Sequence, residues 1–366
     1  MSSKASVAVS SFLGGMILVH HLEKEKVRVK KKAQIMKKIA LLQRERRMMT
    51  SLLIRKFRVG FSGICGIFFL ICFLIFSFFF KTRDDVRIIP LDFSVFSDTP
   101  LINIRIGSAK VPLLADTGSY QDLSLHTSVL NSIPDKEYIK LSSLKDPKGD
   151  VYETKEFMIP SIRIQSHTYE KILTYEQTPE QTAYAGLLFG SSKRIGPIQG
   201  AIGRPFFSKW TCFFDCSNRR LLLAPTMDSL AKHVDLRTFT PIPFELHPQG
   251  IHLSLSTDLG IKRFILDTGA SLSVMKIGLV QEELREETGH PLKKYTTSTL
   301  SFQEKELGPW SFRLHELCSE MVSDGILGID FFLAHRVVID FAHSMVYVSS
   351  EKKPRHRITL FPFLRG

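Results

Sequence analysis

Two aspartates lie in nearly identical surroundings in the two halves of this 366-residue chain. Asp116 belongs to the run LLADTGS (113–119), and Asp267 belongs to FILDTGAS (264–271). In each, an apolar run predicts a buried strand, and the glycine two residues after the aspartate permits a sharp turn. Two carboxylates held close together share one proton, because both cannot ionise cheaply. Such a pair holds a base beside an acid, which suits the attack of water on a peptide carbonyl without a metal ion or a covalent intermediate.

The two halves repeat beyond these loops. GAIG at 200–203 and GILG at 325–328 begin segments that align without a gap, GAIGRPFFSKWTCFFDCSNRRLLLA against GILGIDFFLAHRVVIDFAHSMVYVS, at a constant offset of 125 residues. An Ile-Pro pair precedes each half, at 89–90 and at 242–243. The aspartates are 151 residues apart, so the first half carries 26 more residues between its aspartate and its glycine motif. This repeat predicts two similar lobes that share one site at a pseudo-twofold axis.

The combination of motifs resembles the aspartic protease family, pepsin-like and retroviral-type enzymes together. In that family a segment of two hydrophobic residues and a glycine packs behind each Asp-Thr-Gly loop, and the segments that end in Gly203 and Gly328 match it in place and order. The resemblance covers roughly residues 88–350 and implies an all-β, bilobal aspartic-protease fold made of two retropepsin-like β lobes. A duplicated β-domain whose Asp-Thr-Gly sequences are only turns is the alternative, but it does not explain why the glycine segment follows both.

The resemblance also implies which residues form the site. Asp116 and Asp267 are the expected catalytic pair, and Gly203 and Gly328 are the glycines expected to close the lobes. The expected supporting residues of the two loops are Thr117, Gly118, Ser119, Thr268, Gly269, Ala270 and Ser271. The threonine hydroxyls are expected to brace the two loops. No cofactor is implied, and no metal ion.

The two loops differ at one position. The Ser119 hydroxyl is expected to hydrogen-bond the outer oxygen of Asp116, whereas Ala270 has no hydroxyl at the matching place. A hydrogen bond to an ionised carboxylate lowers its pKa, so the pair is expected to release its shared proton at a higher pH than a pair with two such hydroxyls. Serine is the pepsin-like residue here and alanine the retroviral-like one, and the sequence therefore predicts a mixed site.

Two hairpins are predicted beside the loops. Residues 138–165 read as strands joined by a turn at 146–149. This hairpin takes the place of the flap, which in the family closes over bound substrate, and Tyr152 is a possible flap contact; a strand tyrosine that faces solvent is the alternative. Residues 296–314 are a second candidate flap-like hairpin, and two flaps favour the symmetric retroviral-type layout.

Short helices are predicted at 128–133 and at 279–288, the second ending at Gly289 as a C-cap.

The chain as a whole is predicted to divide into six parts. The predicted parts are a basic cytoplasmic segment (1–58), a single transmembrane helix (59–80), lobe one (88–225), a linker between the lobes (226–242), lobe two (243–350) and a C-terminal tail (351–366).

The positive charge belongs to one short segment. The net charge is +13, but residues 22–58 hold fourteen Lys or Arg and three Glu, while residues 81–366 are nearly balanced at 34 basic and 33 acidic side chains. The body of the protein therefore shows no basic excess of the kind that attracts nucleic acid, and no nucleic-acid partner is expected. Basic residues next to a membrane hold anionic lipid head groups, so lipid is the expected partner of residues 22–58.

An uncharged run of residues follows the basic segment directly. Residues 59–80 contain no charged side chain and are long enough to cross a bilayer as a helix. The run is longer, and starts further from the N-terminus, than a cleavable signal. Because Lys and Arg favour the cytoplasmic side, the sequence predicts a single-pass membrane protein with a cytoplasmic N-terminus. The body is expected outside the cytoplasm, and its lack of N-x-Ser/Thr sequences favours the bacterial periplasm over a glycosylated compartment.

Two classes of function remain. The first is a membrane-anchored aspartic endopeptidase that acts on proteins or peptides, for which one chain suffices because it supplies both aspartates. The second is a non-catalytic peptide-binding or scaffold protein on the same fold. The chain lacks the HExxH, G-x-S-x-G and phosphate-loop motifs of other catalytic classes. A glycosidase also uses two carboxylates, but its chemistry does not require the duplicated motifs.

Overall fold

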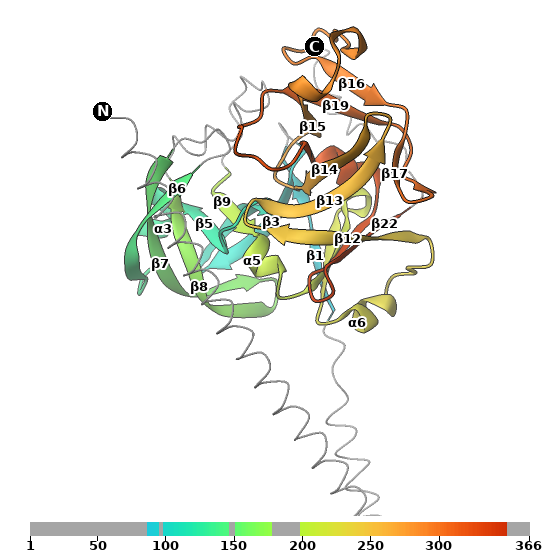
Figure 1. The fold of residues 1–366 in the computed structure, drawn as a ribbon. Helices are drawn as coiled ribbons and strands as arrows, with labels where there is room; N and C mark the ends of the chain where they lie inside the picture. Colours follow the sequence, from blue (N-terminus) through green and yellow to red (C-terminus); the bar gives the residue numbers. More distant parts are fainter. Residues whose placement is uncertain (1–85, 95–97, 146–150, 178–197, 350–366) are drawn as a thin grey trace, which may run out of the picture. The chain divides into compact units, whose positions relative to one another are not determined.

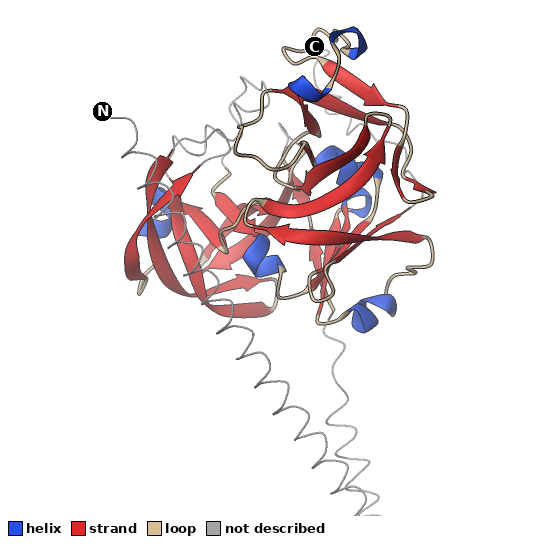
Figure 2. Ribbon diagram, viewed as in Figure 1, coloured by secondary structure: helices blue, strands red, loops and turns tan. Residues whose placement is uncertain are grey.

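The computed structural model describes residues 86–94, 98–145, 151–177 and 198–349 (Figure 1). The chain divides into two compact units, residues 1–83 and 84–366, and all described residues belong to the second. Strands make up most of the described part (Figure 2). Among these residues no helix is long and apolar enough to cross a membrane. The predictions for residues 1–80, for the turn at 146–149 and for the tail from 351 concern segments outside the described ranges.

One sheet of eight strands forms the body of the first lobe. Its strand order is β2-β3-β4-β9-β5-β8-β7-β6. In that order the bounds are Asp92–Phe93, Pro100–Ile106, Ala109–Asp116, Gly200–Gly203, Leu123–His126, His167–Gln177, Val151–Ile164 and Glu137–Lys145. The short helix α3 (Thr127–Asn131) follows β5, close to the range predicted for it. Alternating burial along β3, with its isoleucines inside, is the period-two pattern that predicts a half-buried strand.

A second sheet runs through the second lobe. Its main path is β1-β11-β10-β21-β22-β12-β13-β14-β20-β15-β19-β16, and β17 and β18 pair beside it. In path order the bounds are Arg87–Pro90, Arg220–Ala224, Thr211–Asp215, Val337–Asp340, Met345–Ser349, Phe239–His247, Gly250–Thr257, Gly260–Leu266, Gly325–Leu327, Val274–Lys276, Trp310–His315 and Lys294–Thr297, then Leu300–Phe302 and Lys305–Glu306 for β17 and β18. The segment predicted as a linker holds α6 (Met227–Ala231) and the start of β12.

Six of these strands join the two repeats edge to edge. β10 and β21 occupy matching places in the two halves, and they pair antiparallel at the centre of β1-β11-β10-β21-β22-β12. The outer pairings follow the repeat: Ile89 lies opposite Leu221, and Ile242 lies opposite Val346, 125 residues after Leu221. The predicted duplication is thus confirmed in the register of the strands, Ile-Pro pairs included.

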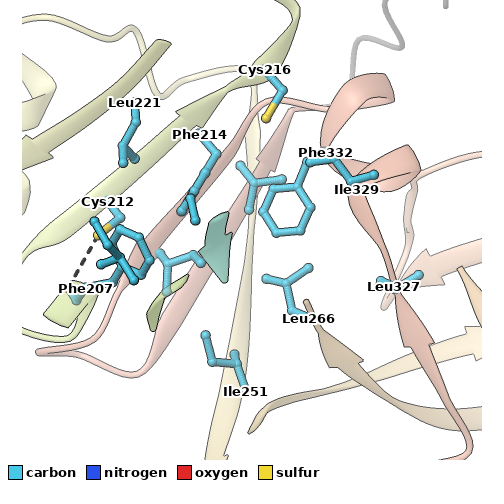
Figure 3. Packing of buried hydrophobic residues seen from close by; sticks show 14 of the residues in the cluster. Phe207, Cys212, Phe214, Cys216, Leu221, Ile251, Leu266, Leu327, Ile329 and Phe332 are labelled. Atoms are coloured by element: carbon cyan, nitrogen blue, oxygen red, sulfur yellow. Dashed lines mark hydrogen bonds between the residues drawn. The ribbon is translucent and has the colours of Figure 1, made fainter. Parts of the chain in front are cut away.

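Aromatic side chains fill the space behind the central strands. Phe214 and Phe332 meet edge to face with ring centroids 5.5 Å apart, a favourable arrangement for two rings. Figure 3 shows Phe332 and Ile329 beside Leu266 and Leu327 in one apolar cluster. The cluster therefore joins the glycine segment of lobe two to the strand that leads into its Asp-Thr-Gly loop.

The helix predicted at 279–288 is wrong. Two single 3-10 turns, η2 (Ile277–Leu279) and η3 (Glu282–Leu284), stand in its place. The guanidinium group of Arg285 donates to the carbonyls of Ile277 and Val280. The Val280 carbonyl would accept a backbone bond within a helix at 279–288, whereas Ile277 precedes that range. A side chain therefore takes the place of a helical backbone donor at Val280.

The two predicted hairpins differ in how they are held. β6 and β7 form a long hairpin, and β6 is the edge strand of its sheet. β17, by contrast, pairs with β13 as well as with β18, so the hairpin at 296–314 is fastened to the sheet. β19 runs parallel to β15 as β8 runs parallel to β5, which makes the β17–β18 hairpin the counterpart of the β7–β8 turn. The prediction of a second flap is therefore wrong for this hairpin.

Candidate active site

Matching strand pairs carry the two aspartates. Asp116 is the last residue of β4 and lies opposite Gly203 of β9 in a parallel pair. Asp267 follows β14, which pairs in parallel with β20, and its N–H donates to the carbonyl of Leu327 at 3.0 Å. Each aspartate therefore lies at the end of a strand that is paired with a buried neighbouring strand, and this backbone pairing fixes the position of the aspartate in each lobe.

Two buried threonines join the loops across the lobes. The backbone N–H of Thr117 donates to Oγ1 of Thr268 at 3.0 Å, and the N–H of Thr268 donates to Oγ1 of Thr117 at 3.0 Å. Each hydroxyl then donates to a carbonyl of the opposite strand, Thr117 to Leu266 at 3.1 Å and Thr268 to Ala115 at 2.6 Å. Both side chains are fully buried, so four hydrogen bonds, shielded from water, hold the loops together.

The loop glycines face the opposite aspartates. A Cβ atom on Gly118 would lie 2.4 Å from Cγ of Asp267, and one on Gly269 would lie 2.6 Å from Cγ of Asp116. The two carboxyl groups hydrogen-bond one another. Gly118 and Ser119 each donate a backbone N–H to Oδ1 of Asp116 at 2.9 Å, and Gly269 donates to Oδ1 of Asp267 at 2.8 Å. The structure thus brings together the two aspartates predicted from the sequence.

The surroundings raise the pKa of both carboxyl groups. Burial is the largest cause for Asp116 and for Asp267, because desolvation penalises the charged form. The neighbouring charge of Asp267 raises the pKa of Asp116 further, while backbone N–H donors partly oppose the rise at both. Each side chain still keeps part of its surface open to solvent. The pair therefore retains a proton to a higher pH than free aspartates and remains accessible to a bound molecule.

Within the described ranges, no three His, Cys, Asp or Glu side chains gather as metal ligands.

The hydrogen bond expected from the Ser119 hydroxyl to Asp116 is absent from the described site. Oγ of Ser119 accepts from the N–H of Gln121 at 3.3 Å, and only the backbone of Ser119 reaches the aspartate. The hydroxyl lies on the side of Gly203, where a Cβ atom would be 3.0 Å from it. Ala270 is buried, and its N–H donates to Asp267. The prediction that the pair releases its shared proton at a higher pH than a pair with two such hydroxyls therefore loses its stated cause, the single hydrogen bond from Ser119.

The glycine segments pack behind the loops in both lobes. In lobe one, the N–H of Arg204 donates to the carbonyl of Ser119 at 3.0 Å, and in lobe two the N–H of Ile329 donates to the carbonyl of Ala270 at 2.8 Å. A Cβ atom on Gly203 would lie 1.9 Å from the carbonyl oxygen of Gln121, and one on Gly328 would lie 2.5 Å from the carbonyl carbon of Leu272. Only glycine permits this approach of two backbones.

Loop residue Ser271 lies outside the hydrogen-bonding core of the site. It is partly exposed and makes no hydrogen bond to either aspartate in the described part of the chain. Tyr152, near the start of β7, hydrogen-bonds Tyr120, the residue that follows the first loop. The hairpin and the first loop therefore meet through two phenol groups.

Sequence reasoning missed two residues beside the site. Tyr120 has a local signal, its place directly after the loop. Arg204 has a signal in the repeat, because its counterpart 125 residues later is apolar Ile329. Arg204 opens the short helix α5 (Arg204–Phe207) and is only 7% exposed.

Comparisons with known proteins match the architecture. The soybean basic 7S globulin aligns with a TM-score of 0.52 at 9% identity, over 73% of this chain and 95% of that one. Conglutin gamma, a basic 7S globulin from lupine seeds, aligns with 0.51 at 11%, over 73% and 95%. An aspartic proteinase from Irpex lacteus aligns with 0.47 at 14%, over 74% and 99%. The chain has a two-lobed, aspartic-protease-like fold.

The same comparisons leave the activity open. No protein-family model matches the chain, and no curated protein matches it. At identities this low, a structural likeness shows the fold alone, and a fold hosts more than one function. What the site does must therefore be argued from its own geometry.

The glycine segments generate a first prediction. Gly203→Ala and Gly328→Ala each place a methyl group against backbone, so each is expected to lower the free energy of unfolding by about 1–3 kcal/mol or more. Gly278→Ala is the matched control, since nothing lies within 4 Å of its added Cβ. Thermal unfolding of the full-length protein measures the difference, and equal stability of the three variants contradicts the packing described.

The raised pKa values of the aspartate pair lead to a second prediction, on how stability depends on pH. Because the folded pair binds protons more tightly than the unfolded chain, its stabilisation is complete below the unfolded pKa of about 3.8 and is lost as the pH rises through the folded values. Asp267→Asn removes one ionisable carboxyl group. Its unfolding midpoint, relative to wild type, should therefore rise steadily from pH 3 to pH 8 in calorimetry.

The exposed Asp228 supplies the control for this experiment. Asp228→Asn removes an exposed carboxyl group in place of a buried one and is measured over the same pH range. A midpoint difference for Asp267→Asn that does not change with pH would show that the aspartate pair has ordinary pKa values.

Proposed function

We propose that this protein is a membrane-anchored aspartic endopeptidase. The observation that carries the proposal is the contact between Asp116 and Asp267, two partly exposed carboxyl groups that hydrogen-bond one another and have raised pKa values. A raised pKa in one member of a carboxyl pair keeps a proton available near the working pH, which is what acid and base catalysis by a single pair requires.

The proposed reaction needs one proton on the pair. The ionised carboxylate takes a proton from a water molecule held between the two groups, and the protonated carboxyl group donates to the carbonyl oxygen of the peptide. The water oxygen attacks the carbonyl carbon, and a tetrahedral diol forms. The C–N bond then breaks as one carboxyl group of the pair gives its proton to the amine nitrogen. The other carboxylate accepts a proton from a hydroxyl of the diol, which becomes the carboxyl group of the product, and the pair is again singly protonated. The backbone N–H groups of Gly118, Ser119 and Gly269 orient the carboxylates throughout.

The substrate is proposed to be a protein or peptide segment in extended form. The hairpin of β6 and β7 stands beside the site through the contact of Tyr152 with Tyr120, which supports its assignment as the flap. One chain suffices for the proposed reaction because both lobes belong to it.

The membrane anchor is part of the same proposal. It rests on the uncharged run at 59–80 and on the basic residues at 22–58 that precede it. In the proposed arrangement the basic segment contacts lipid on the cytoplasmic side. The peptidase body then acts on the other side, in the periplasm if the host is bacterial.

Catalysis generates a third prediction. Asp116→Asn and Asp267→Asn are each expected to reduce peptide cleavage at least 10³-fold, and the double variant should be little worse, because the two groups act as a unit. Asp228→Asn is the control on an exposed carboxylate and should cleave normally. Cleavage of a mixed peptide library by full-length protein, followed by mass spectrometry, gives the measurement.

The outcome also separates the two classes of function. Retention of near-normal turnover by either single variant would rule out the shared pair. If the wild type binds peptides from the library without cleaving them, the protein is a non-catalytic peptide-binding protein on this fold.

The orientation generates a fourth prediction. Protease added to intact spheroplasts, or to sealed vesicles of the equivalent orientation, should digest the body and spare an epitope placed before residue 58. Detergent should expose both. Full protection of the body in the sealed preparation would contradict the proposed orientation.

A further inference from the structure

A buried arginine lies behind the proposed catalytic pair. Arg204 follows Gly203, whose register partner in the neighbouring strand is Asp116. Its backbone N–H donates to the carbonyl of Ser119, in the same loop as that aspartate. The residue is 7% exposed, and a charged side chain buried to this degree costs several kcal/mol unless something compensates it.

The repeat shows that the fold does not require a charge at this position. Ile329 is the counterpart of Arg204, and its N–H makes the equivalent bond to the second loop. Ile329 is fully buried and belongs to the apolar cluster around Phe332 and Leu266 (Figure 3). An apolar residue thus serves the same backbone role in lobe two, so the charge of Arg204 needs a separate explanation.

The guanidinium group is only partly satisfied by hydrogen bonds. Nη2 donates to the carbonyl of Pro248 at 2.9 Å, in the turn between β12 and β13. Nη1 is buried and has no hydrogen-bond partner. Next to Nη1 lies Gly250, where a Cβ atom would be 3.6 Å away. One carbonyl does not offset the desolvation of a full positive charge.

The two aspartates offset part of this cost. The negative charges of Asp116 and Asp267 raise the pKa of Arg204 against the lowering caused by its burial. Arginine keeps its proton under all ordinary conditions, so it presents a permanent positive charge to the pair. The attraction is mutual, since a cation that is stabilised by carboxylates favours their ionised form in return.

Other ionisable groups lie on the strands beside Arg204. Beyond it on β12 and β13 lie His247 and His252, whose rings are 4.9 Å apart. Burial and nearby cations lower the pKa of His252 to about 4, so it is neutral when the pair is working. Arg263 forms an ion pair with Glu245.

On the side of the first loop, Asp122 forms an ion pair with Lys209 at 3.3 Å. Tyr120 remains neutral, since burial and the neighbouring Tyr152 raise its pKa.

We propose that Arg204 is a positioning residue whose buried positive charge sets the pH range over which the aspartate pair carries a single proton. The Ser119 hydroxyl was expected to stabilise the ionised form of the pair through a hydrogen bond; Arg204 stabilises it through its charge, from behind the first loop. The inference rests on the proposed function only in that the same pair performs the reaction; the electrostatic effect exists whether or not the protein cleaves peptides.

The test compares three variants of the full-length protein. Arg204→Gln removes the charge while keeping an N–H donor for the Pro248 carbonyl, Arg204→Met removes both, and Arg204→Lys keeps the charge. Without the charge, both limbs of the profile of kcat/KM against pH should move to higher pH, because the ionised carboxylates lose a stabilising cation. Arg204→Lys should keep the limbs near their wild-type positions.

A matched control is Arg285→Met, because Arg285 is also partly buried and bound to backbone carbonyls. It should change stability without moving either limb. If Arg204→Gln and Arg204→Met lower kcat at every pH while the limbs stay in place, the role is merely structural and the proposal is overturned.

A second readout does not depend on activity. The unfolding temperature of Asp267→Asn, relative to the protein that still has Asp267, is expected to rise with pH. When both proteins also carry Arg204→Gln or Arg204→Met, the same rise should occur at a higher pH. Movement of this rise in a protein that cleaves nothing supports the role of Arg204 and refutes the peptidase. Cleavage with both readouts unmoved refutes the role of Arg204 alone.

Discussion

The crossed hydrogen bonds between Thr117 and Thr268 fix the separation of the two lobes at their closest point. Each threonine accepts from the other's backbone and donates to the other's strand, so neither loop has a complete set of partners without its counterpart. Once the loops are locked, the aspartates beside the threonines are forced into contact. The raised pKa values follow from that contact and from the protein packed around it.

Strand pairing extends the same constraint outward. The parallel pairs of β4 with β9 and of β14 with β20 hold the loops from behind, and the six strands centred on β10 and β21 join the repeats below them. The symmetry is close in the backbone and broken in the side chains. Arg204 in the place that Ile329 occupies in the other repeat, and the long hairpin of β6 and β7 in the first lobe, give the two aspartates different surroundings on a shared frame.

Much of this arrangement could be predicted from the sequence, because the motifs recur at a constant spacing. Asp116, Asp267 and the glycine segments were found through the repeat, and the register of β1 and β12 follows the duplicated Ile-Pro pairs. Each failure has its own physical cause. The side chain of Arg285 donates to the Val280 carbonyl, which a helix at 279–288 would have used for a backbone bond. The Ser119 hydroxyl turned to Gln121 because side-chain direction depends on neighbours that no motif encodes. Pairing of β17 with β13 is a contact between distant segments, which local patterns do not report.

The crossed placement of the glycines bears on how such a duplicated chain changes over time. The space that Asp267 needs is provided by Gly118, and the space for Asp116 by Gly269. Each repeat therefore carries the steric allowance for the other repeat's carboxyl group. A substitution at either glycine therefore meets the aspartate of the other half, whereas Arg204 and Ile329 differ in side chain although they occupy matching places in the repeat.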